Sequence, residues 1–337
     1  MSVNKTGDAT SEDADFYGIN AAILANNGST LTIANSNVTT DGAHANGVFS
    51  YGQGTTVNIS DSTITTTGNN SGGLMTTGGA ALNATNLTVS TSGNSSAAIR
   101  TDRGGGTVTA TKGSYSTSGV GSPAIYSTAD ITVSDATLSA TNSEAVVIEG
   151  GNSVTINNSD VTGSNAKLNG QSTVKTNVLI YQSMSGDASE GDSDFNMTGG
   201  TLTSLTGSMF HVTNTTTTIN LNGVSLVNAA DSSDFLIASA DSWGTSGKNG
   251  GNATVNLSNQ TVEGNVTVDS VSSVTLNIKD GSSYTGAISN KGKANVTIEA
   301  SGTWTLTGDS YVTSLSNAGT INLNGHKLYV NGVEYTG

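Results

Sequence analysis

Apolar and polar residues alternate along this chain in a unit that recurs about every 25 residues. In residues 56–64, Val57 and Ile59 are apolar, the polar Asp61 follows, and Ile64 is the next apolar position. The same order appears in residues 30–38, 81–89, 130–138 and 153–161. Alternation within short segments predicts β-strands with one buried face. A repeat of 20 to 50 residues predicts a solenoid, a propeller or an array.

A fourth apolar position gives the length of the repeat. Val48 lies 25 residues after Ile23, Leu74 lies 26 residues after Val48, and Ile99 and Ile125 continue the series. A small residue precedes each of these positions, which indicates a crowded corner. With no helical periodicity, each repeat is interpreted as one turn of a coil. The sequence therefore predicts an all-β fold, a single-stranded right-handed parallel β-helix of about a dozen coils.

The turns provide an independent check on this repeat. Asn, Asp or Gly predominates two residues after the second inward position, because a sharp bend between strands favours positive φ. This turn column is expected at Asn35, Asp61, Asn86, Lys112, Asp135, Asn158, Gly199, Gly223, Asn259, Asp280, Ala300 and Gly325, where Lys112 and Ala300 are the exceptions. Asn side chains that stack in register there would form a ladder along the axis.

The spacing of the repeat becomes less regular after residue 161, but the repeat continues. Later coils are placed at Phe195 to Phe210, Ile219 to Phe235, Val255 to Val266, Leu276 to Ile288 and Val296 to Leu315. The whole chain, 1–337, is interpreted as one β-helix domain with a polar lead-in over residues 1–15. Insertions are expected at 162–178, 181–194 and 238–253. The second and third should leave the same corner two coils apart, and the first should leave a different corner.

Composition excludes several classes of partner. The net charge is −14 and only 11 residues are Lys or Arg, which disfavours nucleic acid and anionic membrane surfaces. Cys is absent, and no apolar run approaches the roughly 18 residues that a membrane span needs. We therefore expect no membrane insertion, no thiol chemistry and no cofactor. Because the first residues lack the apolar core of a signal peptide, the chain is interpreted as a fragment without its signal and anchor.

Two insertions supply the candidate ligand-binding residues. Tyr181 and Trp243 are aromatic side chains that could stack on sugar rings. Four polar residues of the same loops complete the set, namely Gln182, Asp187, Asp192 and Lys248. In the alternative interpretation, Trp243 folds down to cover the coil edge. The acidic stretch 187–194 offers oxygen ligands for calcium, but its spacing fits no calcium motif, so it is interpreted as a solvated loop and no metal site is assigned.

The strand faces are poor in catalytic residues. Arg100 and Arg103 are placed in a turn between coils, and no carboxylate cluster is expected at matched positions in neighbouring coils. The three histidines fall in unrelated coils. We therefore predict that the protein is not an enzyme. Ranks of Thr, Ser and Asn at outward positions resemble the ice-binding faces of antifreeze solenoids, although Thr is also the favoured exposed β-residue.

Several stretches resemble a group of bacterial surface proteins. Residues 122–127, 145–150 and 179–187 look like large adhesin-like β-helix proteins of gut bacteria, and residues 318–325 are similar to autotransporter passenger repeats. The resemblance implies an extracellular or cell-surface location and a non-catalytic adhesin or structural rod. Its implied partners are host or environmental glycans or surface proteins. A polysaccharide-active enzyme and an ice-binding solenoid are the alternatives.

Overall fold

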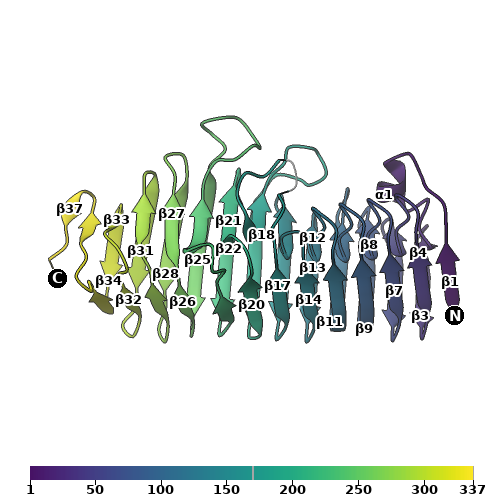
Figure 1. The fold of residues 1–337 in the computed structure, drawn as a ribbon, viewed down its shortest axis with the longest axis horizontal. Coiled ribbons are helices and arrows are strands. Elements are labelled where there is room, and N and C mark those ends of the chain that lie inside the picture. Colours follow the sequence, from purple (N-terminus) through teal and green to yellow (C-terminus); the bar gives the residue numbers. More distant parts are fainter. Residues whose placement is uncertain (169–170, 337) are drawn as a thin grey trace.

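The computed structural model describes residues 1–168 and 171–336 and shows a long coil of β-strands (Figure 1). Among these residues there is one helix, the five-residue α1 (Asp13–Tyr17). The strands stack along one axis, from the N-terminus at one end of the rod to the C-terminus at the other. Neighbouring coils are joined by parallel strand pairing throughout, except at the C-terminal β-hairpin. The prediction of an all-β, parallel β-helix is confirmed.

One face of the rod is an 11-stranded parallel sheet, to which eleven successive coils contribute one strand each. Its members, in spatial order, are β2 (Ile23–Ala25), β5 (Val48–Tyr51), β8 (Leu74–Thr77), β10 (Ile99–Thr101), β12 (Ile125–Ser127), β15 (Val146–Glu149), β18 (Thr176–Tyr181), β21 (Ser208–Thr213), β24 (Asp234–Ala238), β27 (Asn265–Val268) and β30 (Ile288–Asn290).

The remaining faces are formed by a 19-stranded sheet and two small sheets near the C-terminus. The 19-stranded sheet contains β1 (Ser2–Lys5), β3 (Thr30–Ala34), β4 (Asn37–Thr40), β6 (Thr56–Ser60), β7 (Thr63–Thr66), β9 (Ala80–Thr91), β11 (Gly106–Thr117), β13 (Asp130–Ser134), β14 (Thr137–Ala140), β16 (Ser153–Asn157), β17 (Asp160–Gly163), β19 (Asp192–Thr198), β20 (Thr201–Ser204), β22 (Thr215–Asn222), β23 (Ser225–Val227), β25 (Gly251–Ser258), β28 (Ser273–Ile278), β31 (Lys293–Ile298) and β34 (Ser314–Asn317). The small sheets contain β26 (Thr261–Glu263), β29 (Ser283–Thr285), β32 (Thr303–Thr305) and β35 (Thr320–Asn322), and β33 (Ser310–Val312), β36 (Leu328–Val330) and β37 (Val333–Glu334).

The apolar columns of the repeat fill the interior of the coil. Ile23 pairs with Val48, Val48 with Leu74, and Leu74 with Ile99, which confirms the predicted register. These side chains pack into one continuous core that runs along the axis. Each turn of the coil therefore buries its apolar side chains against the next turn, as expected for a solenoid.

One later placement is wrong. Leu315 belongs to the coil after that of Val296, because the two residues are paired across neighbouring strands. The coil that begins at Ile219 ends as predicted at Phe235 and the adjacent Leu236, both of which are buried, with a shift of register between Asp234 and Leu236. The error at Leu315 arises where the repeat changes length, so that counting along the chain no longer identifies the partner coil.

The turn column adopts positive φ at ten of its twelve predicted positions, Lys112 included. The two exceptions are Asp280, where the next residue Gly281 takes the positive φ of 76°, and Ala300. In this column Asn86 donates a hydrogen bond to the side chain of Asp61 (2.7 Å). The long amide ladder lies elsewhere, on strands β19, β22, β25 and β28, where Asn196, Asn220, Asn256 and Asn277 are joined at 2.7–2.9 Å.

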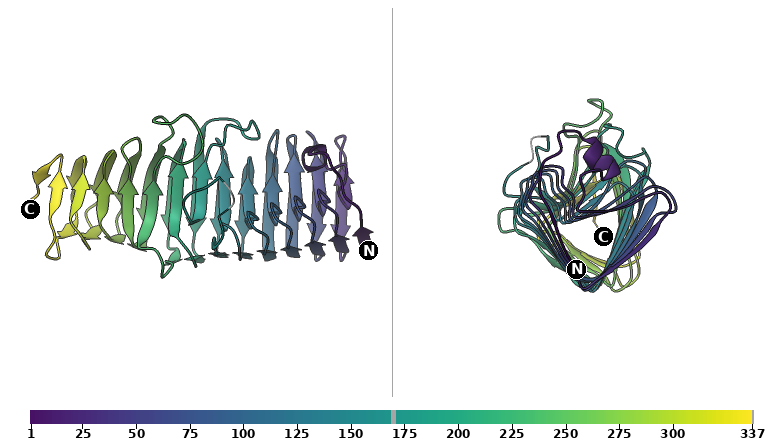
Figure 2. Two further views of the ribbon diagram at one scale, coloured as in Figure 1. Left: turned by 45° about the horizontal axis from the view of Figure 1, so that its top comes forward. Right: turned by 90° about the vertical axis from the view of Figure 1, so that its right-hand side faces the viewer.

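The segment predicted as a polar lead-in has defined structure. Strand β1 pairs with β4, and α1 lies against the outer face of the 11-stranded sheet (Figure 2). The backbone carbonyl of Phe16 accepts a hydrogen bond from Thr77 (2.6 Å), and Asp15 is 2.8 Å from His44. Gly18 has a φ of 68°, and a Cβ there would lie 2.6 Å from the Phe49 ring. The N-terminal segment is thus closely packed on the coil.

The three insertions correspond to the connections β17–β18, β18–β19 and β24–β25. The second and third leave the same corner of the coil, after strands of the 11-stranded sheet that are two coils apart. The first leaves another corner but bends toward the third, since the amide and the hydroxyl of Thr173 donate to the Asp241 carboxylate (3.1 and 2.8 Å). All three insertions therefore meet on one side of the rod.

Candidate functional site

The outer face of the 11-stranded sheet differs from the other outer faces of the coil. Its outward residues form a column in register, Phe49, Met75, Arg100, Tyr126, Val147, Leu179 and His211. Most of these side chains are buried, because α1 and the insertions cover them. Strand β15 accordingly has four buried residues in succession, Val146 to Glu149, a pattern typical of a strand that is covered on both faces. This column of mostly large side chains contrasts with the matched outward positions of the 19-stranded sheet, which carry Thr or Asn, as at Thr109, Thr132 and Thr155.

Tyr181 and Trp243 meet on this face. Their ring centroids are 4.5 Å apart and the rings are inclined at 54°. Both rings pack over Val147 and Leu179, and only 8% of Tyr181 and 9% of Trp243 remain exposed. The predicted aromatic pair thus comes together, and Trp243 also covers the edge of the coil, as in the alternative interpretation.

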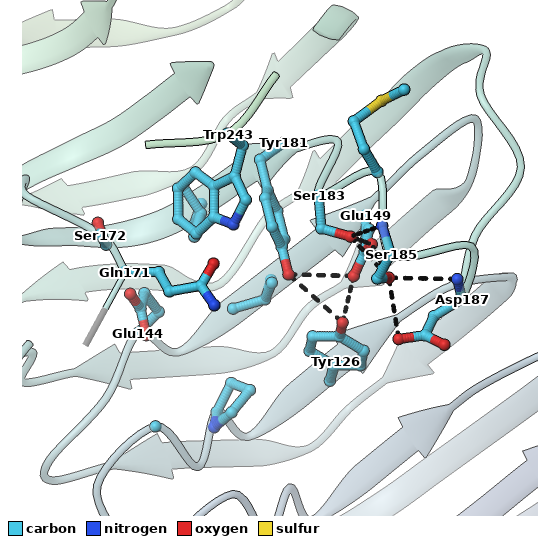
Figure 3. A pocket seen from close by; sticks show the side chains of 15 residues that line it. Tyr126, Glu144, Glu149, Gln171, Ser172, Tyr181, Ser183, Ser185, Asp187 and Trp243 are labelled. Atoms are coloured by element: carbon cyan, nitrogen blue, oxygen red, sulfur yellow. Dashed lines mark hydrogen bonds between the residues drawn. The ribbon is translucent and has the colours of Figure 1, made fainter. Parts of the chain in front are cut away.

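The aromatic pair forms one wall of a cavity of about 460 Å³ (Figure 3). Strands β12, β15 and β18 form its floor, and side chains from all three insertions form its sides. Of the residues predicted as ligand-binding, Tyr181, Asp187 and Trp243 line this cavity. The same cavity is lined by Tyr126, Glu144, Glu149, Ser183 and Ser185, which are not among the predicted residues.

The Glu149 carboxylate lies at the centre of the polar side of the cavity. One oxygen accepts hydrogen bonds from the hydroxyls of Tyr126 and Tyr181, the latter at 3.0 Å. The other oxygen accepts from Ser183 and, at 3.4 Å, from Ser185. Only 1% of Glu149 is exposed. Four hydroxyls are therefore oriented by one buried carboxylate.

The two phenols stay protonated over the physiological range. Burial, followed by the charge of the neighbouring Glu149, raises the pKa of Tyr181. Burial is also the largest cause that raises the pKa of Tyr126. Since each phenol donates its hydrogen to Glu149, its oxygen lone pairs are left to accept hydrogen bonds from a ligand in the cavity.

Two further carboxyl groups line the cavity. Glu144 accepts hydrogen bonds from Ser143 and Asn165 (both 2.9 Å), and burial raises its pKa. Asp187 accepts a hydrogen bond from Ser185 (3.0 Å) and forms an ion pair with Arg103 (2.7 Å). Ser185 therefore bridges Asp187 and Glu149.

The prediction of a turn is wrong for Arg100 and correct for Arg103, which lies in the turn after β10. Arg100 lies in strand β10 rather than in a turn, and its guanidinium contacts Asp102 at 2.5 Å. Carboxylates reach the two arginines from outside the strand positions of neighbouring coils, because Asp187 contacts Arg103 from a loop 84 residues away and Asp15 approaches from α1. Arg103 also stacks on Phe16 of α1, with its guanidinium carbon 3.8 Å from the ring centroid. Spacing along the chain could not show these contacts.

The other three predicted residues, Gln182, Asp192 and Lys248, line a second cavity of about 670 Å³. It lies where β19, β22 and β25 begin, between the second and third insertions. Met184 lines both cavities. The predicted site is thus divided into two adjoining cavities of different composition.

One feature of the sequence points to the missed residues. Outward positions of the 19-stranded sheet mostly carry Thr, Ser or Asn, whereas the outward positions of β12 and β15 in the 11-stranded sheet carry Tyr126 and Val147, and Glu149 ends β15. Large outward side chains at the same position of successive coils therefore mark the covered face. The residues contributed by the insertions have no such periodic signal.

Comparison of the chain with protein-family models, curated proteins and solved structures found no match. Within residues 1–168 and 171–336, no helix is long and apolar enough to cross a membrane. In the same part of the chain, no three or more His, Asp or Glu side chains are grouped as metal ligands. Any functional argument therefore depends on the geometry of the covered face.

Proposed function

We propose that this protein is a non-catalytic rod of a bacterial cell surface that binds glycans in the cavity beside Tyr181 and Trp243. Its location is extracellular or at the cell surface, and its partners are host or environmental glycans. The observation that carries the proposal is the pairing of an aromatic wall with four oriented hydroxyls around a single cavity. Sugar rings present apolar C–H faces and many hydroxyls, and such a cavity complements both.

The charges in the cavity favour uncharged sugars. Glu144, Glu149 and Asp187 all line it, whereas the nearby guanidiniums of Arg100 and Arg103 are each paired with a carboxylate. A uronate, sialic acid or sulfated sugar would bring a further negative charge close to these groups, where interactions between charges are weakly screened. The ligands expected are therefore neutral hexoses or hexosamines.

The environment of Glu149 supports a binding role rather than hydrolysis. Its two oxygens already accept four hydrogen bonds, and the side chain is almost entirely buried. A general acid or nucleophile must reach the glycosidic bond directly. Glu149 therefore acts by positioning the hydroxyls of Tyr126, Tyr181 and the two serines.

A glycoside hydrolase is the second candidate, and one observation favours it. Glu144 has a raised pKa and lines the same cavity as Glu149 and Asp187, and two carboxyl groups with different environments are the usual requirement for glycoside hydrolysis. Incubation with a panel of neutral polysaccharides tests this candidate. Release of reducing ends that is abolished by E144Q would support hydrolysis, and intact polymers would exclude it for that panel.

The binding proposal is tested on a glycan array with the wild type and two variants. Y181F removes one hydroxyl from the cavity and W243F shortens the aromatic wall, and each should weaken binding to neutral glycans by roughly fivefold to tenfold, about 1 kcal/mol. Y115F is the matched control, because Tyr115 is a buried tyrosine whose hydroxyl bonds to the Lys112 carbonyl, away from the cavity.

Two results would contradict the proposal. Binding that is the same in Y181F, W243F and Y115F would place the ligand elsewhere on the rod. Binding restricted to uronate-containing or sulfated glycans would overturn the assignment to uncharged sugars. Circular dichroism of each variant would verify that the coil remains folded.

A further inference from the structure

The second cavity adjoins the first across a single residue, Met184. We propose that the two cavities are consecutive subsites for one oligosaccharide, which crosses Met184 and turns around the corner of the coil. The inference rests on the proposed glycan-binding function and adds to it the length and the path of the ligand.

The two cavities are formed by opposite sides of the same two loops. In the second insertion, Tyr181 lines the first cavity and the next residue, Gln182, lines the second. In the third insertion, Trp243 lines the first cavity and Gly244 lines the second. In each loop, two adjacent residues thus line different cavities. The loops therefore separate two cavities that lie side by side.

Met184 forms the ridge between the two cavities, and hydrogen bonds fix the backbone on which it stands. Met184 has a φ of 68°, which is unusual for a side chain of its size, and 56% of the residue is exposed. Its amide donates to the side-chain oxygen of Gln182 (3.2 Å), and the Gln182 carbonyl accepts from Asn214 (2.7 Å). An exposed, flexible apolar side chain on a fixed backbone is suited to contact the apolar face of a sugar that passes over it.

The lining of the second cavity is suited to hydroxyl groups. Amides and hydroxyls of Asn214, Thr216 and Asn252 come from the beginnings of β22 and β25 or the residue before them, and Gly244 and Gly250 expose backbone. Two carboxylates, Glu190 and Asp192, and one ammonium, Lys248, also line it. This lining contains no aromatic side chain among the described residues, so the second subsite would contribute hydrogen bonds rather than stacking.

Calorimetric titration with a series of oligosaccharides from one to five units tests the inference. The series is built from a neutral sugar that the array identifies as bound. The affinity should be about tenfold higher for an oligosaccharide that reaches the second cavity than for one that fills only the first. The reason is that each net hydrogen bond raises the affinity a few-fold. T216W, which fills the second cavity from an exposed strand position, should reduce the affinity for long chains to that for short ones.

The matched control is T88W, because Thr88 is also an exposed outward threonine but lies on β9, away from both cavities. T88W should keep the full gain of affinity with chain length. An equal gain in T216W and T88W, or no gain in the wild type, would overturn the inference while leaving binding in the first cavity intact. Failure of every length to bind would overturn the proposed function together with it.

Discussion

His211 is the clearest single-residue consequence of the covered face. In an uncovered coil its outward position would be exposed, but loops bury it completely. Its Nε2 contacts the Ser239 hydroxyl (3.1 Å), while Nδ1 has no hydrogen-bond partner among the residues that the structure describes. Burial lowers the pKa of His211 from 6.5 to about 4, although the nearby Asp241 and Asp269 oppose this shift. The imidazole is therefore neutral in the folded protein near pH 6.

This shift predicts a loss of stability in mild acid. The unfolded chain binds a proton at His211 below about pH 6.5 whereas the folded chain does not, so the free energy of unfolding falls between pH 6.5 and about 4. The loss from this group approaches roughly 3 kcal/mol at the acidic end. Thermal melts of H211Q and wild type at several pH values would measure it, and the melting temperature of H211Q should fall less steeply.

The control for this experiment is H326Q, because His326 is substantially exposed. Buried carboxyl groups such as Glu144 act in the opposite direction: their raised pKa increases stability as the pH falls toward 4.5. Because these carboxyl groups are the same in both proteins, the difference between the melting temperatures of H211Q and wild type at each pH measures the contribution of His211. Parallel pH profiles for the two proteins would show that the protonation of His211 does not contribute.

At the scale of the elements, the strands and turns could be predicted and the loops could not. Val48, Leu74 and Ile99 were placed correctly because the face to which a strand side chain points depends only on its position in the alternation. Lys112 was placed correctly in the turn column because the turn geometry repeats, whatever residue occupies it. The contact between Thr173 and Asp241 joins two loops of irregular length, for which no repeat specifies a partner.

The amide ladder predicts a measurable contribution of one strand position to stability. Asn220 donates to Asn196 (2.7 Å) and accepts from Asn256 (2.8 Å), so N220A removes two hydrogen bonds between coils. Each is worth about 1 kcal/mol net, and N220A should lower the free energy of unfolding by about 2 kcal/mol. Chemical denaturation followed by circular dichroism would test this.

The comparison for N220A is T132A, which alters the same outward strand position in another coil. Thr132 is paired with Thr109 and Thr155 but has no side-chain hydrogen bond in the described part of the chain. T132A should change stability by less than about 0.5 kcal/mol. Similar losses in both variants would indicate that the ladder contributes nothing beyond the β-propensity of the position.

At the scale of the whole molecule, stability should vary along the rod. Each coil contacts chiefly its neighbours, so a terminal coil is supported from one side only. Strands β36 and β37 at the C-terminus are mostly intermediate or exposed, and 71% of Val333 is exposed. In contrast, β18 is buried along its whole length, between β15 and β21 and beneath the insertions.

Hydrogen exchange would reveal this gradient. Amides of β36 should exchange at least about a hundredfold faster than those of β18, because opening the terminal coil disrupts contacts on one side only. The N-terminal end should be better protected than the C-terminal end, since α1 and residues 1–15 are packed on it. Uniform protection along the rod would mean that the coil unfolds as one cooperative unit.

The sequence alone determined the coil and, where the repeat keeps its length, its strand register and the positions of its turns, because a periodic pattern of apolar residues specifies which face is buried and which coil is the neighbour. Tertiary structure alone decided that Tyr126, Glu149 and Asp187 surround one cavity and that Gln182 and Lys248 line another. Those contacts join strands to loops of irregular length across several coils. Chain spacing carries no information about such distances, so only the folded backbone brings these side chains together.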